Sequence, residues 1–135
     1  MTPGASDHGL LCINHEFPLS PLLWGGGGGD WDTPPEDRPP ERIGVEKAAI
    51  GLSVVEVKRG VSGWEVVRES PYNRRLTATT PLALSLPVAG HARVQTPADP
   101  EGRTVLGTLE NCSGGTTPWG TVLSGEEHIT HHFIA

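Results

Sequence analysis

The stretch that decides the fold is "LSVVEVKRGVSGWEVVRES", residues 52–70. Two runs rich in β-branched residues flank the short glycine-containing turn "GVSG", which is the pattern of a β-hairpin. Alternation along the first run places Val55 and Val57 on one face, and Glu56 and Lys58 on the other. The sequence therefore predicts an antiparallel hairpin in the middle of the chain.

Short strands and turn signals continue after this hairpin. The turn-like segments "SPYN", "TTP", "LPVAG", "TPADPEG" and "CSGGTTPWG" leave short apolar runs between them, such as "RTVLGTL" and "TVLSGE". The 135 residues include 18 glycines and 13 prolines, which is more than a compact helical core tolerates. Regular short strands with such turns predict an all-β sandwich, barrel or propeller, with the hairpin at 51–69 and a strand pair at 103–127 as pieces of one or two blades.

The N-terminal part predicts one strand and one helix. "GLLCINHEF" (9–17) is a continuous apolar run, typical of a buried strand, and delivers Asn14, His15 and Glu16 to its end. "VEKAAIG" (45–51) predicts a short helix that stops at the final glycine. Between them, the glycine-, proline- and acid-rich segment 25–41 has no periodicity and predicts a flexible insertion.

Charge and hydropathy exclude several classes of partner. The formal net charge is -6, and the ten Lys and Arg residues form no basic stripe that could follow a phosphate backbone, so we expect no nucleic-acid partner. No apolar run has the length of a membrane span. Residues 1–24 lack the charged start and apolar block of a signal peptide, so no export signal is expected in this chain.

The two cysteines, Cys12 and Cys112, lie far apart in the sequence. They could form one disulfide in an exported protein, but they make neither a disulfide framework nor a four-thiolate zinc site. In "NCSGG", Cys112 is followed by Ser113 and two glycines, where the chain can approach a ligand closely. A buried small hydrophobe and a reactive or metal-binding thiolate both fit, and the same three residues from Asn111 match the glycosylation acceptor pattern.

Carboxylates and histidines follow this cysteine. Glu126 and Glu127 end a predicted strand, and because neighbouring strand residues point to opposite faces, only one of them easily faces Cys112. They could be two solvated charges, or one could join Glu16 and a loop carbonyl around a hard cation such as calcium. Three histidines, His128, His131 and His132, have a spacing that zinc sites use. On a strand, however, His131 and His132 would point to opposite faces, and no second pair of ligands lies near in sequence.

Two arginines could serve an anionic ligand. Arg74 and Arg75 lie in "YNRR", and guanidinium groups bind phosphate oxygens in a bidentate manner. A solvated basic turn explains the same residues.

Several blocks together resemble the N-terminal half of the PhoX-type alkaline phosphatase family. The most specific is "NCSGGTTPWGT" (111–121), and it is accompanied by "LLCINHE", "GLSVVEVKR" and "YNRRLTATTPLALS". The similarity covers most of residues 9–133, with 25–41 as the poorly matching part. It implies a β-propeller, exported by the twin-arginine route, that hydrolyses phosphate monoesters with a centre containing calcium and iron.

The resemblance also implies roles for individual residues. Cys112 matches the family's thiolate ligand to iron, and Glu127 matches a metal-binding carboxylate, while Glu16 and Glu126 are further candidate metal ligands. Arg74, Arg75, His15 and His91 lie in similar motifs, and the two arginines remain candidates for substrate binding. The chain departs from the family at Glu110, where the family usually has Asn, and at His128 and Ile129, where it usually has Asn-Phe.

The sequence as a whole predicts an all-β fold, a partial β-propeller in which residues 1–135 form the N-terminal part of a PhoX-like phosphatase domain. The parent protein is expected to be a monomeric metal-dependent phosphate-monoester hydrolase of the periplasm or extracellular space, and the isolated fragment is expected to be inactive. The alternatives are a non-catalytic calcium-binding or structural β-domain and a calcium-dependent lactonase-like propeller hydrolase.

Overall fold

The computed structural model describes residues 4–24, 39–85 and 87–128. These residues form eight strands, two α-helices and one 3₁₀ turn. In chain order they are β1 (His8–His15), α1 (Ser20–Trp24), α2 (Pro40–Ala49), β2 (Gly51–Gly60), β3 (Gly63–Val66), β4 (Arg74–Leu76), β5 (Pro81–Ala83), η3 (Ala92–Val94), β6 (Thr104–Leu106), β7 (Asn111–Thr116) and β8 (Val122–Glu126).

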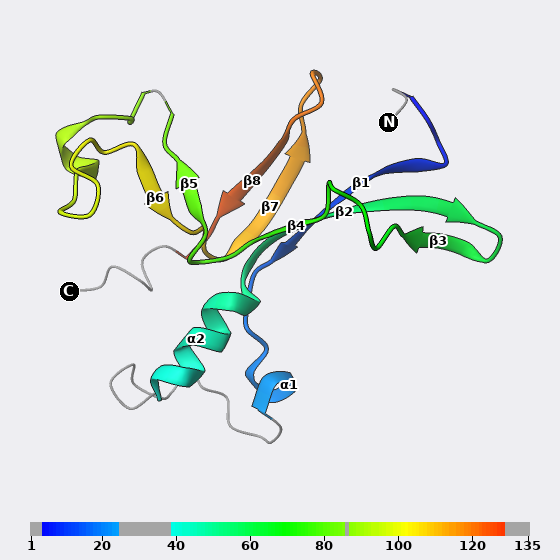
Figure 1. The fold of residues 1–135 in the computed structure, drawn as a ribbon, viewed down its shortest axis with the longest axis horizontal. Coiled ribbons are helices and arrows are strands. Elements are labelled where there is room, and N and C mark those ends of the chain that lie inside the picture. The colour runs from blue at the N-terminus through cyan, green and yellow to red at the C-terminus, as the bar shows by residue number, and fades with distance from the viewer. Residues whose placement is uncertain (1–3, 25–38, 86, 129–135) are drawn as a thin grey trace.

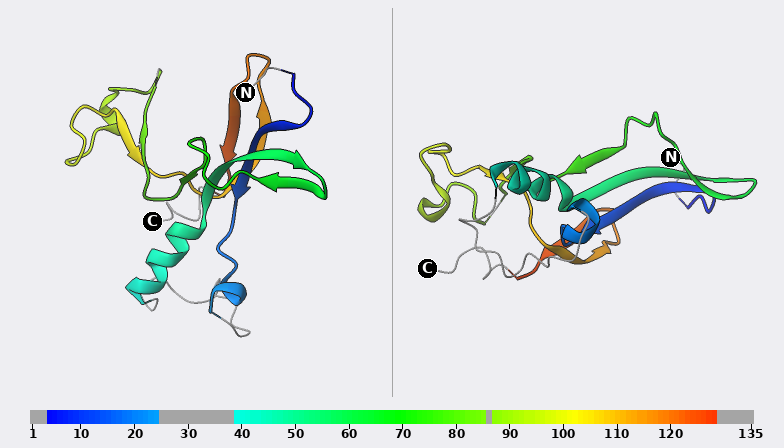
Figure 2. Two further views of the ribbon diagram at one scale, coloured as in Figure 1. Left: turned by 45° about the vertical axis from the view of Figure 1, so that its right-hand side comes forward. Right: turned by 90° about the horizontal axis from the view of Figure 1, so that it is seen from below.

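The strands form three antiparallel groups that extend from one common region, with the two helices on the opposite side (Figure 1). The largest is a four-stranded sheet in which β2 pairs with β1, β3 and β4. The other two groups are the pairs β5–β6 and β7–β8. The turned views in Figure 2 keep the β7–β8 hairpin between the β5–β6 pair and the four-stranded sheet. The prediction of a mostly β fold of short antiparallel strands is confirmed.

The hairpin expected in the middle of the chain is β2 and β3. Their register ends at the pair Gly60 and Gly63, which leaves Val61 and Ser62 as a two-residue turn. Gly63 has a φ of 134°, a value that residues with a Cβ rarely adopt, which explains the glycine there. The β-branched run therefore determines the strand and the two glycines determine where it reverses.

The helix predicted at 45–51 begins earlier than expected. The helix α2 starts at Pro40, where the absent N–H and fixed φ of proline are compatible with a first helical turn. Its C-cap is Ile50, and Gly51 follows with a φ of 109°. Pro40 and Glu41 of the predicted insertion 25–41 thus belong to the helix, and residues 25–38 lie outside the described residues.

The strand at the N-terminal end is also confirmed, but its burial is not. Strand β1 pairs with β2 along its whole length, from His8 opposite Lys58 to His15 opposite Gly51. Its apolar side chains nevertheless remain more than one third exposed, because no other described element covers both faces; they are Leu10, Leu11 and Ile13.

The predicted strand pair at 103–127 is divided between two groups. Strand β6 pairs with β5, in the register Pro81 opposite Leu106, while β7 pairs with β8. The glycine between β6 and β7 explains the separation. Gly107 has a φ of 78°, and a Cβ on it would lie 2.0 Å from the carbonyl oxygen of Ala78. The chain therefore turns out of the β5–β6 pair at a point where only glycine fits.

Burial is concentrated in a few positions. Among the described residues, the buried apolar side chains are Ile50 and Val54, whereas the buried polar ones are Glu56, Thr108, Glu110 and Asn111. Glu56 lies on the face opposite Val55 and Val57, as the alternation predicted. The interior around the strand ends is thus largely polar, and polar interiors require partners for every group.

Candidate metal centre

The end of β1 lies against the β7–β8 hairpin. Asn14 donates from Nδ2 to the carbonyl oxygens of Cys112 (2.9 Å) and Ser113 (3.2 Å), and its Oδ1 accepts from the hydroxyl of Ser124 (2.9 Å). These bonds connect residues that are 98 to 110 positions apart in the sequence. Glu16, two residues after Asn14, is thereby brought to the same place as the cysteine.

Buried polar side chains also stabilise the β7–β8 hairpin from within. Asn111, which is 1% exposed, donates from Nδ2 to Thr108 Oγ1 (2.9 Å) and to Ser124 Oγ (3.1 Å). Ser124 is therefore shared by Asn14 and Asn111. The resulting chain of hydrogen bonds fixes the backbone on both sides of Cys112.

The thiol of Cys112 lies beside two carboxylates. Hydrogen bonds to Glu127 first and Glu16 second, with partial desolvation and the two negative charges, raise the pKa of Cys112 to about 11. The carboxylates favour the protonated thiol, since it can donate to them and a thiolate would be repelled. Without a bound cation, Cys112 is therefore a proton donor rather than a nucleophile at neutral pH.

One histidine joins this group. Glu16, Glu127 and His128 each offer a ligand atom, and the three atoms lie within 4.8 Å of one another. His128 Nε2 lies 3.4 Å from Glu127 Oε1. Sequence reasoning gave the three histidines no metal role, because two of them would diverge on a strand and no second ligand pair lies near in sequence. The structure brings His128 to Glu16 and Glu127, and it follows β8 with a φ of 50°. His131 and His132 lie outside the described residues.

Glu126 points elsewhere. Its Oε1 accepts a hydrogen bond from the backbone N–H of Leu109 (2.8 Å). In the register of the β7–β8 hairpin, Glu126 lies opposite Asn111. The two adjacent glutamates thus face different neighbours, as the strand alternation required. Glu126 holds the loop before β7, and its predicted role as a metal ligand stays a prediction.

The two arginines also have local partners. Arg75 donates from Nη2 to the carbonyl oxygens at the end of α2, with the shortest bond, 2.6 Å, to Ala49. Arg74 donates to the carbonyl oxygen of Tyr72 (3.0 Å). Arg75 therefore binds the carbonyl end of the helix, where a cation is favourable, and its predicted role in substrate binding stays a prediction.

The other histidines named from the sequence are engaged in local structure. His15 Nε2 lies 2.8 Å from Ser53 Oγ, and burial together with the positive charge of Arg75 lowers the pKa of His15. His91 caps η3 by accepting from the backbone N–H of Arg93 (3.1 Å). Neither histidine belongs to the group of possible metal ligands formed by Glu16, Glu127 and His128.

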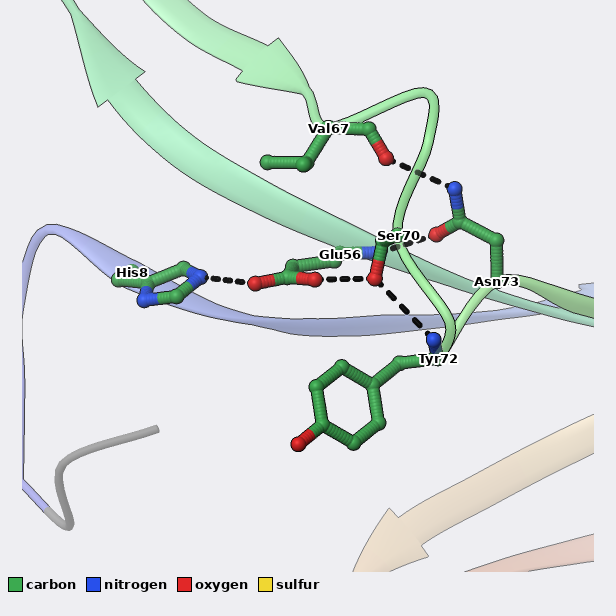
Figure 3. Close-up of polar contacts among 6 residues, drawn as sticks. All are labelled: His8, Glu56, Val67, Ser70, Tyr72 and Asn73. Carbon is green, nitrogen blue, oxygen red and sulfur yellow. Dashed lines mark hydrogen bonds and ion pairs between the residues drawn. The ribbon is translucent and has the colours of Figure 1, made fainter.

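A second polar cluster, at the other end of the sheet, was missed by sequence reasoning. The carboxylate of Glu56 is held between His8 and Ser70, and its backbone N–H donates to Asn73 Oδ1 (2.8 Å), as Figure 3 shows. The hydrogen bond from Ser70 lowers the pKa of Glu56 against the opposing effect of desolvation, and His8 adds to the lowering. Alternation located Glu56 on its face but could not show that a turn beyond β3 would cover it.

Asn73 completes this cluster by binding the turn itself. It donates from Nδ2 to the carbonyl oxygens of Val67 (2.8 Å) and Arg68 (3.0 Å). The partners of these groups all come from β1, β2 and the turn after β3. The cluster is therefore best explained as a structural connection of β1, β2 and the turn.

Both cysteines are free thiols, so the structure contains no disulfide between Cys12 and Cys112. Neither helix in the described part of the chain has the length and hydropathy that a bilayer span requires.

Comparison with known proteins agrees with the resemblance seen in the sequence. Residues 1–135 match the family model described as alkaline phosphatase PhoX. A solved structure, Pseudomonas fluorescens PhoX in complex with vanadate, a transition state analogue, is 39% identical and superimposes with a TM-score of 0.80. The match covers 96% of this chain and 21% of that chain, so the present chain spans about a fifth of that protein's length. No curated protein matches significantly. The prediction of a partial β-propeller is confirmed by this match.

Proposed function

Because the chain belongs to the PhoX family of alkaline phosphatases, we propose that it carries one side of the metal centre of a phosphate-monoester hydrolase. The observation that supports this most directly is the meeting of Cys112 with Glu127 and Glu16, which come from two different groups of strands. The proposed substrate is a small phosphate monoester, and the proposed location of the complete enzyme is the periplasm or the extracellular space.

The residues fit the metals that the resemblance implies. A thiol with two carboxylates is an unfavourable place for negative charge, as the raised pKa of Cys112 indicates. A multivalent cation reverses this preference, because a coordinating thiol loses its proton outright. Thiolate suits iron and carboxylate oxygen suits calcium, so Cys112 would hold iron, and Glu16 and Glu127 would hold iron or calcium.

When bound, such cations neutralise the phosphate charge and stabilise the leaving oxygen. The contribution of this chain is to position their ligands. Asn14 holds the carbonyl oxygens of Cys112 and Ser113, while Glu126 fixes the loop that leads into β7. Cys112 acts as a ligand in this proposal and not as the attacking group.

The proposal is tested with a chimera in which residues 1–135 replace the matching fifth of the P. fluorescens protein. We expect the chimera, supplied with calcium and iron, to hydrolyse p-nitrophenyl phosphate at alkaline pH. Cys112→Ala should lower kcat/KM by about a hundredfold or more, since removing even an outer partner of a metal ligand costs about 10- to 100-fold.

The matched control is Cys12→Ala, which removes the other thiol from the middle of β1 and should leave kcat/KM almost unchanged. A folded chimera that binds the metals but does not hydrolyse the ester would contradict the proposal. Equal activity with and without Cys112 would contradict the role given to that residue.

A further inference from the structure

His128 occupies the position next to Glu127, at the point where β8 has ended. Its ligand atom lies within 4.8 Å of those of Glu127 and Glu16. The PhoX family usually has Asn at this position, so the imidazole distinguishes this chain from the usual family sequence. A nitrogen donor therefore lies beside the same two carboxylates that contact the Cys112 thiol.

The imidazole is held from two sides. Its ring centroid lies 6.2 Å from that of Phe17, with the two planes inclined by 38°. On another side its Nε2 lies 3.4 Å from Glu127 Oε1. Two consecutive residues from the end of β1, Glu16 and Phe17, thus face two consecutive residues from the end of β8. The side chain of His128 remains 41% exposed, which leaves the ring accessible to an ion.

The backbone makes this orientation possible. His128 has a φ of 50°, in the left-handed region, where histidine is found several times more often than most residues with a side chain. A residue in this conformation leaves the alternation of the preceding strand. Glu127 and His128 can therefore face the same site, although adjacent residues within a strand could not.

The spacing is compatible with a shared ion. Ligands about 2.1 Å from a tetrahedral centre are about 3.4 Å apart. The ligand atoms of the three side chains lie within 4.8 Å of one another, which is at most about 1.4 Å more than that spacing.

We propose that His128 is a metal ligand beside Glu16 and Glu127, and that its nitrogen makes the site, which these carboxylates share with Cys112, selective for a first-row transition ion over calcium. Imidazole nitrogen and thiolate sulfur suit such ions, whereas calcium takes oxygen ligands. The inference rests on the metal centre proposed above, and it adds a ligand and a metal preference to it.

The test uses Co²⁺ as a spectroscopic probe of the 135-residue chain carrying Cys12→Ser, so that Cys112 is its single thiol. We expect visible d–d bands and a near-ultraviolet thiolate-to-cobalt absorption. His128→Asn should weaken Co²⁺ binding about tenfold or more and shift the d–d bands. Calcium affinity should change by less than about threefold, since the asparagine offers an oxygen ligand.

The matched control is His91→Asn. It removes the imidazole that caps η3, far from the site in the sequence, and retains a side chain able to cap a helix turn. We expect its Co²⁺ titration to match that of the parent chain. Circular dichroism checks that each variant keeps the same secondary structure.

The possible failures are distinguishable. If His128→Asn binds Co²⁺ with unchanged affinity and an unchanged spectrum, the inference is overturned, while a thiolate-to-cobalt band that disappears in Cys112→Ser still supports the metal centre. If the parent chain shows no thiolate-to-cobalt band, both the inference and the metal role of Cys112 are overturned. A calcium affinity that falls as steeply as that for Co²⁺ would contradict the proposed selectivity.

Discussion

Cys112 differs from an ordinary thiol because two carboxylates accept hydrogen bonds from its S–H and so favour the protonated form. With its pKa raised to about 11, the metal-free thiol should react with iodoacetamide about tenfold more slowly at pH 8 than an ordinary cysteine. The thiolate fraction falls by about two orders of magnitude, and the greater nucleophilicity of a high-pKa thiolate recovers about one of them. The measurement is the alkylation rate against pH in a Cys12→Ser background.

Two variants separate the causes of this shift. Glu127→Gln removes the largest contribution and should lower the apparent pKa of Cys112, so that alkylation at pH 8 becomes faster. Glu126→Gln changes a carboxylate that binds the N–H of Leu109 and should leave the apparent pKa of Cys112 in place. Equal effects of the two substitutions would contradict the arrangement described.

Glu110 is strained at its backbone. It has a φ of 46° and is 6% exposed, and the left-handed conformation costs about 1–2 kcal/mol for most L-residues. Asparagine adopts this conformation more readily, so Glu110→Asn should raise the free energy of unfolding by about 0.5–1 kcal/mol. Urea denaturation measures the change, and Glu69→Asn, at an exposed position, should change the free energy of unfolding by less than about 0.5 kcal/mol.

At the scale of the elements, glycine determines where strands can approach. A Cβ on residue 107 would lie 2.0 Å from the carbonyl oxygen of Ala78, and the φ of 78° already disfavours a side chain. Gly107→Ala should therefore lower the free energy of unfolding by about 3 kcal/mol or more. Gly115→Ala, where a Cβ meets nothing within 4 Å, is the matched control and should be nearly neutral in the same urea titration.

Asn14 is the side chain that connects β1 to the hairpin beyond it. Asn14→Ala removes two donated bonds and one accepted bond, and should lower the free energy of unfolding by about 2 kcal/mol. Because Glu16 follows Asn14 at the strand end, the variant should also lower the apparent pKa of Cys112. An unchanged alkylation profile in a destabilised Asn14→Ala chain would show that Asn14 does not position Glu16.

The elements also show how far sequence reasoning reaches. Local patterns predicted the β2–β3 hairpin, because β-branched runs and turn glycines act over a few residues. They could not predict that Glu56 would be covered, because its partners His8 and Ser70 come from other segments. Likewise the position of Cys112 beside Glu16 depends on Asn14, a contact across almost the whole chain. The role of Arg75 at the end of α2 was missed because nothing in "YNRR" indicates which carbonyl groups lie nearby.

At the scale of the molecule, much apolar surface is exposed. Several large side chains on different groups of strands are each at least 48% exposed, namely Leu11, Trp64, Leu106, Trp119 and Leu123. Among the described residues, Ile50 and Val54 are the buried apolar side chains, so most of the apolar surface stays available for contact with further polypeptide. Since the matched PhoX structure is about five times as long, we infer that its additional segments cover the equivalent surfaces there.

The isolated chain should accordingly bind the dye ANS and self-associate. Addition of the remaining four fifths of the P. fluorescens protein should reduce both, as measured by fluorescence and by light scattering. Leu123→Ser should lower dye binding, whereas Val61→Ser, at a fully exposed hairpin turn, should not. Dye binding that is absent in the isolated chain would contradict this interpretation.

The register that places His15 opposite Gly51 makes residues 16–50 one long connection at the tip of an antiparallel pair. The entropy lost on closing such a connection grows only with the logarithm of its length, by about 0.6 kcal/mol for each doubling. Insertions and deletions between Trp24, where α1 ends, and Pro40, where α2 begins, should therefore be tolerated by the sheet. The same connection begins directly after Glu16, so variation in its length can change what surrounds the site without disturbing the strand that positions it.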